Sequence, residues 1–152
     1  MPGRRMACPA TDTMSMDKSV TRLRVRYSET DQMGTFYNSR ALEWFECGRT
    51  ELLRQIGMPY TVLEASGVYL PLVEAHVQFL GRAQYDDLLE LTTSAVFEGK
   101  ARLRCDVRVV QAVGGQPVAE GYTVHAFTNR EGKPMRPPAW LAEKLTQKGI
   151  VE

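Results

Sequence analysis

The residues that could do chemistry are concentrated in a polar loop at residues 29–38, ETDQMGTFYN. Asp31 lies in this loop, a few residues before a predicted helix whose first N–H groups have no partner inside the helix and attract polarised oxygens. A carbonyl oxygen held by those N–H groups would be activated as in an oxyanion hole. The Asp31 carboxylate could then attack the carbonyl carbon or deprotonate a water. Alternatively, Asp31 only accepts hydrogen bonds from turn amides.

Other polar residues give weaker evidence of a reactive site. Glu46 could supply a second carboxylate, or it could have only a surface or interface role. The histidines, His76 and His125, do not form a ligand-spaced cluster, so no metal site is predicted. We expect His125 to be a hydrogen-bonded strand residue. No Gly-x-Ser-x-Gly motif is present, which argues against a serine hydrolase of the α/β-hydrolase type.

Two elements would hold the polar loop in place. Residues 22–27, RLRVRY, alternate between basic and apolar side chains, which predicts a half-buried strand with Leu23, Val25 and Tyr27 on its inner face. Residues 38–56 carry apolar side chains at spacings of three and four, which predicts a long amphipathic helix. A glycine and a proline directly after this segment end the helix.

The rest of the chain is typical of hairpin-linked strands and a short final helix. An apolar-striped helix needs a sheet to cover, and hairpin-linked strands make that sheet antiparallel. The sequence therefore predicts an α+β fold, the hotdog fold, in which a long central helix is wrapped by a curved five-stranded antiparallel sheet. The exposed face and edges of such a sheet favour a homodimer or homotetramer. The predicted strands are 69–80, 89–97, 102–109 and 117–129, and the helix is 139–147.

Bulk properties limit the class of protein. The 152 residues suit one domain, expected at residues 21–148 behind a disordered leader at 1–20. A net charge of +1 gives no reason to expect nucleic acid or an anionic membrane as the partner. No segment has the roughly 20 apolar residues of a membrane helix, and the leader lacks the apolar stretch of a secretory signal. Three widely spaced cysteines predict reduced thiols, so we expect a cytoplasmic protein.

A set of motifs extends from the first strand to the turn before the 89–97 strand. They are YSETDQMG at 27–34, FYN at 36–38, LEWFE at 42–46, RTE at 49–51 and AQYDDLLEL at 83–91. Together they resemble the signature of the 4-hydroxybenzoyl-CoA thioesterase family, which includes bacterial acyl-CoA thioesterases associated with the Tol–Pal system. The resemblance covers residues 23–141, and its most specific part is the Asp-x-x-Gly loop between a strand and the long helix.

This resemblance implies hydrolysis of an acyl-CoA thioester to the free acid and CoA. The family's essential aspartate falls on Asp31, as nucleophile or general base, and the backbone N–H that polarises the thioester carbonyl falls on Asn38. Tyr37 and Gly34 are the expected substrate-binding residues, although Tyr37 could instead stack in the core. The chain departs from the family where some relatives have histidine at position 38, and again at residues 40–41, so the acyl group is not assigned.

Coenzyme A carries several phosphate charges and needs cations to bind it. The resemblance places CoA-binding basic residues close to Lys100 and Arg136, with Arg102 and Lys133 as further candidates. All four could instead be solvated surface charges. Coenzyme A is part of the substrate, and no separate cofactor is predicted.

Two other functions remain compatible with the sequence. A hotdog dehydratase acting on a hydroxyacyl thioester would pair an acidic residue with a histidine, and neither histidine lies in the loop of Asp31. A non-catalytic acyl-CoA-binding module would need the cations but not the carboxylate. The sequence therefore favours acyl-CoA hydrolysis.

Overall fold

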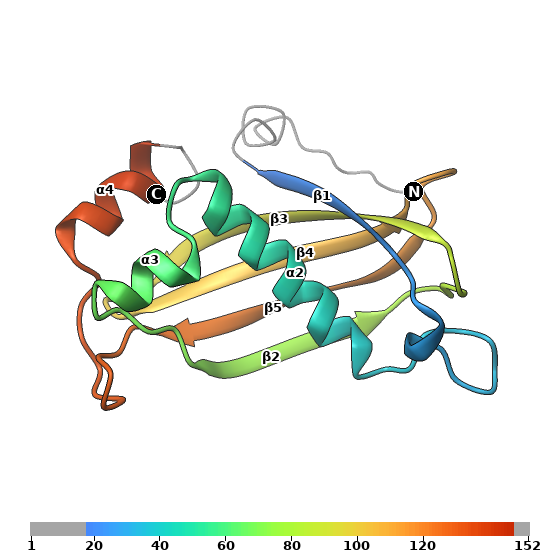
Figure 1. The fold of residues 1–152 in the computed structure, drawn as a ribbon, viewed down its shortest axis with the longest axis horizontal. Coiled ribbons are helices and arrows are strands. Elements are labelled where there is room, and N and C mark those ends of the chain that lie inside the picture. Colours follow the sequence, from blue (N-terminus) through green and yellow to red (C-terminus); the bar gives the residue numbers. More distant parts are fainter. Residues whose placement is uncertain (1–17, 148–152) are drawn as a thin grey trace.

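The fold is built on one five-stranded antiparallel sheet. A computed structural model describes residues 18–147 of the chain. Figure 1 shows the sheet curving past the long helix, with the strands in the order β1-β3-β4-β5-β2. The strands are β1 (Ser19–Arg24), β2 (Leu72–Phe79), β3 (Leu88–Glu98), β4 (Arg102–Gln111) and β5 (Pro117–Ala126).

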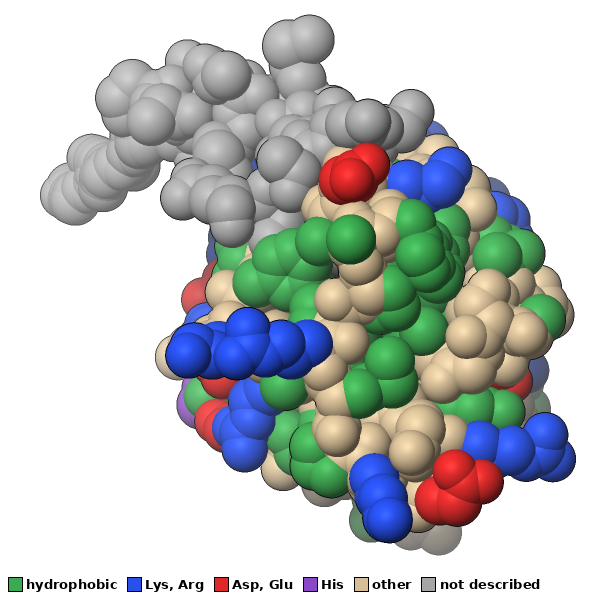
Figure 2. Space-filling model, turned by 90° about the vertical axis from the view of Figure 1, so that its left-hand side faces the viewer, with side chains coloured by type: hydrophobic (Ala, Val, Ile, Leu, Met, Phe, Trp, Pro, Cys, Tyr) green, Lys and Arg blue, Asp and Glu red, His purple; other side chains and the backbone are tan. Residues whose placement is uncertain are grey.

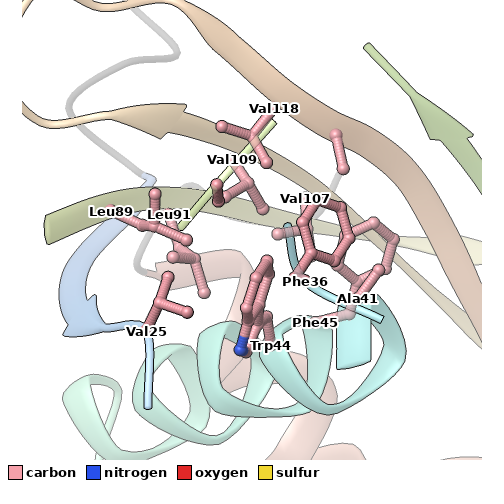
Figure 3. Close-up of a cluster of buried hydrophobic side chains, with 12 residues drawn as sticks. Val25, Phe36, Ala41, Trp44, Phe45, Leu89, Leu91, Val107, Val109 and Val118 are labelled. Atoms are coloured by element: carbon pink, nitrogen blue, oxygen red, sulfur yellow. The ribbon is translucent and has the colours of Figure 1, made fainter. Parts of the chain in front are cut away.

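Helix α2 (Arg40–Gln55) packs across one face of this sheet. Figure 3 shows Trp44 and Phe45 of α2 in a cluster with strand residues that include Leu89 and Val109. This packing confirms the predicted amphipathic helix, because the apolar stripe faces the sheet. The buried residues of α2 are Ala41, Trp44, Phe45, Gly48, Leu52 and Leu53.

Two glycines allow α2 and the sheet to approach closely. A Cβ at Gly48 of α2 would lie 2.3 Å from Thr93 Oγ1 on β3. On β5, a Cβ at Gly121 would lie 1.9 Å from the backbone oxygen of His76 and 3.1 Å from the ring of Phe45. The 2.3 Å and 1.9 Å separations are too short for a real side chain, and the 3.1 Å contact with Phe45 is tight. Gly48 therefore lets α2 approach β3, whereas Gly121 lets β2 approach β5 and leaves room for Phe45 of α2.

The predicted strands and helices are largely confirmed. The residues of β3 and β4 alternate between buried and less buried positions, as the period-two pattern predicts. Helix α4 spans the predicted residues, Ala139–Gln147. The sequence does not predict α3 (Tyr60–Ala65), because six residues are too few to show a helical stripe. Within residues 18–147, no helix is long and apolar enough to cross a membrane.

The prediction for Tyr27 is wrong. Strand β1 ends at Arg24, and Tyr27 instead opens a 3₁₀ turn, Tyr27–Glu29. The side chain is 78% exposed and lies edge-on against Tyr85, with 5.5 Å between ring centroids. The alternation therefore stops before Tyr27, because the chain turns there toward the polar loop.

The start of β1 also differs from the predicted domain boundary. The strand begins at Ser19, inside the segment predicted as a leader, because Ser19 pairs with Thr93 of β3. The first 17 residues of that predicted leader, and the final residue of the domain predicted at 21–148, lie outside the described residues.

Strand β2 is an exposed edge of the sheet. Within the described chain it pairs only with β5, and each of its side chains except Val77 is exposed. Leu72, Val73 and Phe79 are apolar, yet they are 52%, 47% and 51% exposed. An edge with free backbone groups and exposed apolar side chains is suited to pairing with another strand.

Candidate active site

The polar loop before α2 is closed at its base. Thr30 and Phe36 form an isolated antiparallel bridge, and Tyr37 N–H donates to the backbone oxygen of Glu29 at 2.8 Å. Phe36 N–H also donates to the backbone oxygen of Ala83 at 2.9 Å. The base of the loop is therefore held between the 3₁₀ turn, the start of α2 and the segment that precedes β3.

Asp31 is exposed on this loop. Its Oδ1 accepts a hydrogen bond from Met33 N–H at 2.8 Å, and its backbone oxygen accepts one from Gly34 N–H at 3.0 Å. Gly34 has φ +81°, a left-handed conformation that suits glycine. The turn role considered for Asp31 is therefore present. The carboxylate makes no other hydrogen bond within the described residues, so Oδ2 is open to solvent and to a ligand.

The start of α2 presents free N–H groups. Arg40 N–H and Ala41 N–H donate to the backbone oxygens of Tyr37 and Asn38, at 2.9 and 3.2 Å. Within residues 18–147, no backbone oxygen accepts a hydrogen bond from the N–H of Asn38 or Ser39, and no side chain caps the helix there. Both residues are exposed. A polarised oxygen can therefore bind at this helix start.

A buried carboxylate, Glu29, joins the loop to α2. Glu29 is 3% exposed and accepts hydrogen bonds from Arg26 N–H at 2.7 Å and from Trp44 Nε1–H at 3.0 Å. Burial raises the pKa of Glu29, but these hydrogen bonds and the Arg26 charge outweigh it, so the pKa lies below its ordinary value. Because Trp44 belongs to α2, the ionised carboxylate fixes the loop against the helix.

The other predicted residues lie in different surroundings. Tyr37 is 52% exposed on the polar loop, which excludes the core-stacking alternative. Glu46 is exposed on α2. His76 is exposed and stacks on Tyr122, with 5.5 Å between ring centroids. Cys105 is buried, and burial raises the pKa of its thiol to about 12. Among residues 18–147, no group of three His, Cys, Asp or Glu side chains is arranged to hold a metal.

The predicted CoA-binding cations lie together at one end of the sheet. Lys100 and Arg102 belong to the turn between β3 and β4 and the start of β4. Phe127 forms backbone hydrogen bonds, both 2.9 Å, with the residue after Lys100 and with the residue before Arg136. All three cations are exposed. Figure 2 views the end of the molecule that carries α4, where Lys and Arg side chains surround a central apolar area.

Asp31 is remote from these cations within one chain. Its loop contacts Ala83, just before β3 begins, whereas Lys100 follows the end of β3. The 11 residues of β3, at about 3.3 Å each, separate the two ends by roughly 35 Å. One chain therefore does not bring the loop and the predicted CoA-binding cations together.

A second polar cluster connects α2 with α3 and β5. Arg49 of α2 donates from Nε to Tyr60 Oη at 2.7 Å and from Nη1 to Thr123 Oγ1 at 3.4 Å. His125 contacts Thr123 Oγ1 through Nε2 at 2.9 Å and the backbone oxygen of Leu70 through Nδ1 at 3.0 Å. Since a carbonyl oxygen only accepts, Nδ1 carries the proton and Nε2 accepts from the threonine hydroxyl. The predicted hydrogen-bonded role of His125 is confirmed.

This cluster contains a neutral histidine beside a cation. Burial and the nearby Arg49 charge lower the pKa of His125 to about 4, although the hydrogen bond to Leu70 opposes the shift. Sequence patterns alone give no role to Glu29, Arg49 or Tyr60. The motifs at 27–34 and 49–51 contain the first two, but a motif alone does not show which distant side chain each one meets.

Comparisons with known proteins agree with this fold. The Thioesterase-like superfamily matches residues 25–145, and the chain therefore belongs to this family of hotdog proteins. The putative acyl-CoA thioesterase YneP of Bacillus subtilis is 38% identical over 72 residues, which are 47% of this chain and 52% of that protein. The acyl-CoA thioester hydrolase YbgC of Escherichia coli is 30% identical over 90 residues, which are 59% of this chain and 67% of that protein.

A solved structure supports the same assignment of fold. A hypothetical protein from Thermus thermophilus is 33% identical and superposes with a TM-score of 0.79, over 86% of this chain and 96% of that one. The sequence matches span only about half of the Bacillus protein and two-thirds of the Escherichia protein, 52% and 67% of their lengths. The family match at residues 25–145 and the superposed structure, over 86% of this chain, establish the family and the fold along most of the chain.

Glu29→Ala is expected to destabilise the protein by about 1–3 kcal/mol, because it leaves the Trp44 indole N–H and the Arg26 N–H without their acceptor. Glu29→Gln retains a carbonyl oxygen as an acceptor and should cost less. Urea unfolding followed by tryptophan fluorescence measures both variants. Equal stability of Glu29→Ala and the wild type would contradict the role of this carboxylate.

The free energy of unfolding should fall as the pH drops from 6.5 to about 4, because the unfolded chain protonates His125 before the folded chain does. Above pH 6.5 the full stability is present, and the loss across this window reaches about 3 kcal/mol. His125→Gln should remove this component, whereas His76→Gln, at an exposed histidine, should keep it. Urea unfolding at several pH values compares them, and the same slope in all three proteins would contradict the buried neutral histidine.

Proposed function

We propose that the protein is an acyl-CoA thioesterase in which Asp31 and the start of α2 act on the thioester carbonyl. The observation that carries this proposal is the loop itself. An exposed carboxylate with an open oxygen lies on the loop that leads directly into a helix start with free N–H groups. Membership of the Thioesterase-like superfamily and the names of the YneP and YbgC relatives support the same reaction.

In the proposed reaction, the N–H groups at Asn38 and Ser39 hold the thioester oxygen and stabilise its negative charge in the transition state. Asp31 acts in one of two ways. As a nucleophile, its carboxylate forms a bond to the carbonyl carbon and expels the CoA thiolate, and water then hydrolyses the mixed anhydride. As a general base, it takes a proton from the water that attacks the same carbon, and the carbon–sulfur bond then breaks to release the CoA thiolate. Tyr37 and Gly34, on the same loop, are the proposed substrate-binding residues.

The hydroxyacyl dehydratase is less well supported. That reaction pairs a carboxylate with a histidine. Both ring nitrogens of His125 already have partners in the interior, and His76 stacks on Tyr122. Neither ring lies on the loop of Asp31. The non-catalytic module remains the second candidate, and thiol release from acyl-CoA substrates distinguishes the two functions.

We also propose that two chains form a homodimer through their β2 edges and share each active site. Two-fold pairing of antiparallel β2 strands would place the start of one β2 beside the end of the other. Phe79, at the end of β2, lies against Phe36 at the base of the polar loop, with ring centroids 6.0 Å apart. Lys100, Arg102 and Arg136 of one chain would then approach Asp31 of the other, as CoA binding requires. The structural basis is the exposed, apolar β2 edge.

The sequence also supports a proposal about the architecture of the fold, the cofactor requirement and the location. We propose that α2 is the central helix around which the sheet of the hotdog fold curves. The site is proposed to need no cofactor other than the CoA of its substrate. A cytoplasmic location remains a prediction that rests on the widely spaced cysteines.

Asp31→Asn should lower kcat for thiol release from acyl-CoA substrates by at least about 100-fold, because the amide neither attacks nor accepts a proton effectively. A panel of aromatic, short-chain and long-chain acyl-CoAs, with thiol detected spectrophotometrically, measures the effect. Asp106→Asn, on the outer face of the sheet, is the matched control and should stay near the wild-type rate. Unchanged release in Asp31→Asn would remove Asp31 from the site, and no release from any substrate would favour the binding module.

Mixing two inactive variants should restore activity if each site is shared between chains. Asp31→Asn chains lack the carboxylate, and Lys100→Ala/Arg136→Ala chains lack the cations. In a hybrid dimer, one of the two sites receives both intact parts. Random mixing by refolding should therefore restore about a quarter of the wild-type activity. No recovery in the mixture, with each variant refolded alone as the control, would contradict the shared site.

A further inference from the structure

An open cavity of about 370 Å³ lies beside α3, at the start of β2. Its wall includes Tyr60 of α3, Tyr69 and Leu70 before β2, and Thr128 after β5. Its volume is at the lower end of the range for small-molecule sites, which suits a compact group better than a long hydrocarbon chain. The polar cluster around Arg49 reaches this wall at Tyr60 and at Leu70.

The Tyr60 hydroxyl is a donor available to a ligand. Its oxygen accepts the hydrogen bond from Arg49 Nε at 2.7 Å, so its own proton points elsewhere. Within the described residues no acceptor takes that proton. Burial raises the pKa of Tyr60 although Arg49 opposes the shift, so the phenol stays protonated. The hydroxyl can therefore donate to an oxygen bound in the cavity.

At Tyr60 the positive charge of Arg49 acts more strongly than the negative charge of Glu46, one turn earlier on α2. Arg49 forms no ion pair within the part of the chain that is described, and its hydrogen bonds go to hydroxyl oxygens. His125 is neutral and adds no negative charge. At the rim, exposed Glu64 and exposed Arg130 have opposite charges and offset one another. The inner wall therefore favours an oxygen with negative charge.

The cavity adjoins the catalytic loop only in the dimer. Leu70 and the following residue lead directly into β2, so antiparallel pairing of two β2 edges would place this cavity beside Phe79 of the other chain. Phe79 contacts Phe36 at the base of the loop that carries Asp31. The cavity of one chain would then receive the acyl group of a thioester held at Asp31 of its partner.

We propose that Tyr60, positioned by Arg49, selects acyl groups whose far end carries a carboxylate oxygen. This inference rests on the proposed thioesterase function and on the shared site. Tyr60 donates a hydrogen bond to the distal carboxylate, and Arg49 supplies the positive field without direct contact. A methyl group in the same place would leave the hydroxyl unsatisfied and the charge unbalanced.

The test compares glutaryl-CoA with valeryl-CoA, which have equal chain lengths and differ in carboxylate against methyl at the far end. The wild type is expected to favour glutaryl-CoA at least tenfold in kcat/KM, and Tyr60→Phe should lower this ratio about tenfold by removing one hydrogen bond to a charged group. Turnover of valeryl-CoA by Tyr60→Phe at or above the wild-type rate shows that the variant is folded, since the variant no longer leaves a hydroxyl unsatisfied. Tyr69→Phe removes a different hydroxyl from the same wall and should leave the ratio unchanged.

A wild-type ratio near one, or a ratio that Tyr60→Phe does not alter, would overturn this assignment while leaving the thioesterase proposal intact. An equal loss of the ratio in Tyr69→Phe would also overturn it, because the effect would then belong to the cavity and not to Tyr60. Absence of thiol release from every acyl-CoA would instead overturn the proposed function, and this assignment with it.

Discussion

The arrangement of the candidate site depends on the hydrogen bond between Trp44 and the buried carboxylate of Glu29. A charge in an apolar interior is costly unless its lone pairs are satisfied. Glu29 meets this condition with a backbone N–H, an indole N–H and the Arg26 guanidinium. The donors come from the turn before the loop and from the helix after it. The interaction therefore sets the distance between the loop that carries Asp31 and the helix whose free N–H groups would share its substrate.

The predicted CoA-binding cations lie at the end of the sheet opposite this hydrogen bond. The hairpin of β3 and β4 carries Lys100 to the far end of the sheet, and the segment after β5 carries Arg136 to the same end. A site that needs both ends of the sheet is incomplete in one chain. Pairing of two β2 edge strands would bring the two ends of the sheet together, because two-fold symmetry places the start of one antiparallel strand beside the end of the other. In the proposed homodimer, the exposed β2 edge would bring together the predicted site residues that lie apart in one chain.

Sequence patterns predicted elements where one face of the element is buried. Residues 38–56, and the strands that became β3 and β4, have a single apolar face and a clear period. The pattern failed where burial and period are not linked. Helix α3 has only six residues, too few to show a period. The alternation predicted to include Tyr27 ends where the backbone turns into a 3₁₀ helix.

The candidate site could be predicted only in part. Asp31 was predicted because a carboxylate lies just before a helix start and because its loop resembles a thioesterase signature, and its catalytic role stays a prediction. The partnership between Arg49 and Thr123 joins residues 74 positions apart, and that between Trp44 and Glu29 crosses from a helix to a turn. Such pairs are fixed by the tertiary packing of the chain. They leave no period or spacing that a single sequence could reveal.

The close fit at Gly48 and Gly121 has a consequence for how this scaffold can change. Because α2 packs tightly against β3 at Gly48 and its Phe45 lies close to Gly121 of β5, the helix has little room to shift against the sheet. Substitutions are therefore tolerated best in the loops at the two ends of the sheet, where new side chains meet solvent. Ligand preference can change there while the start of α2 keeps its position.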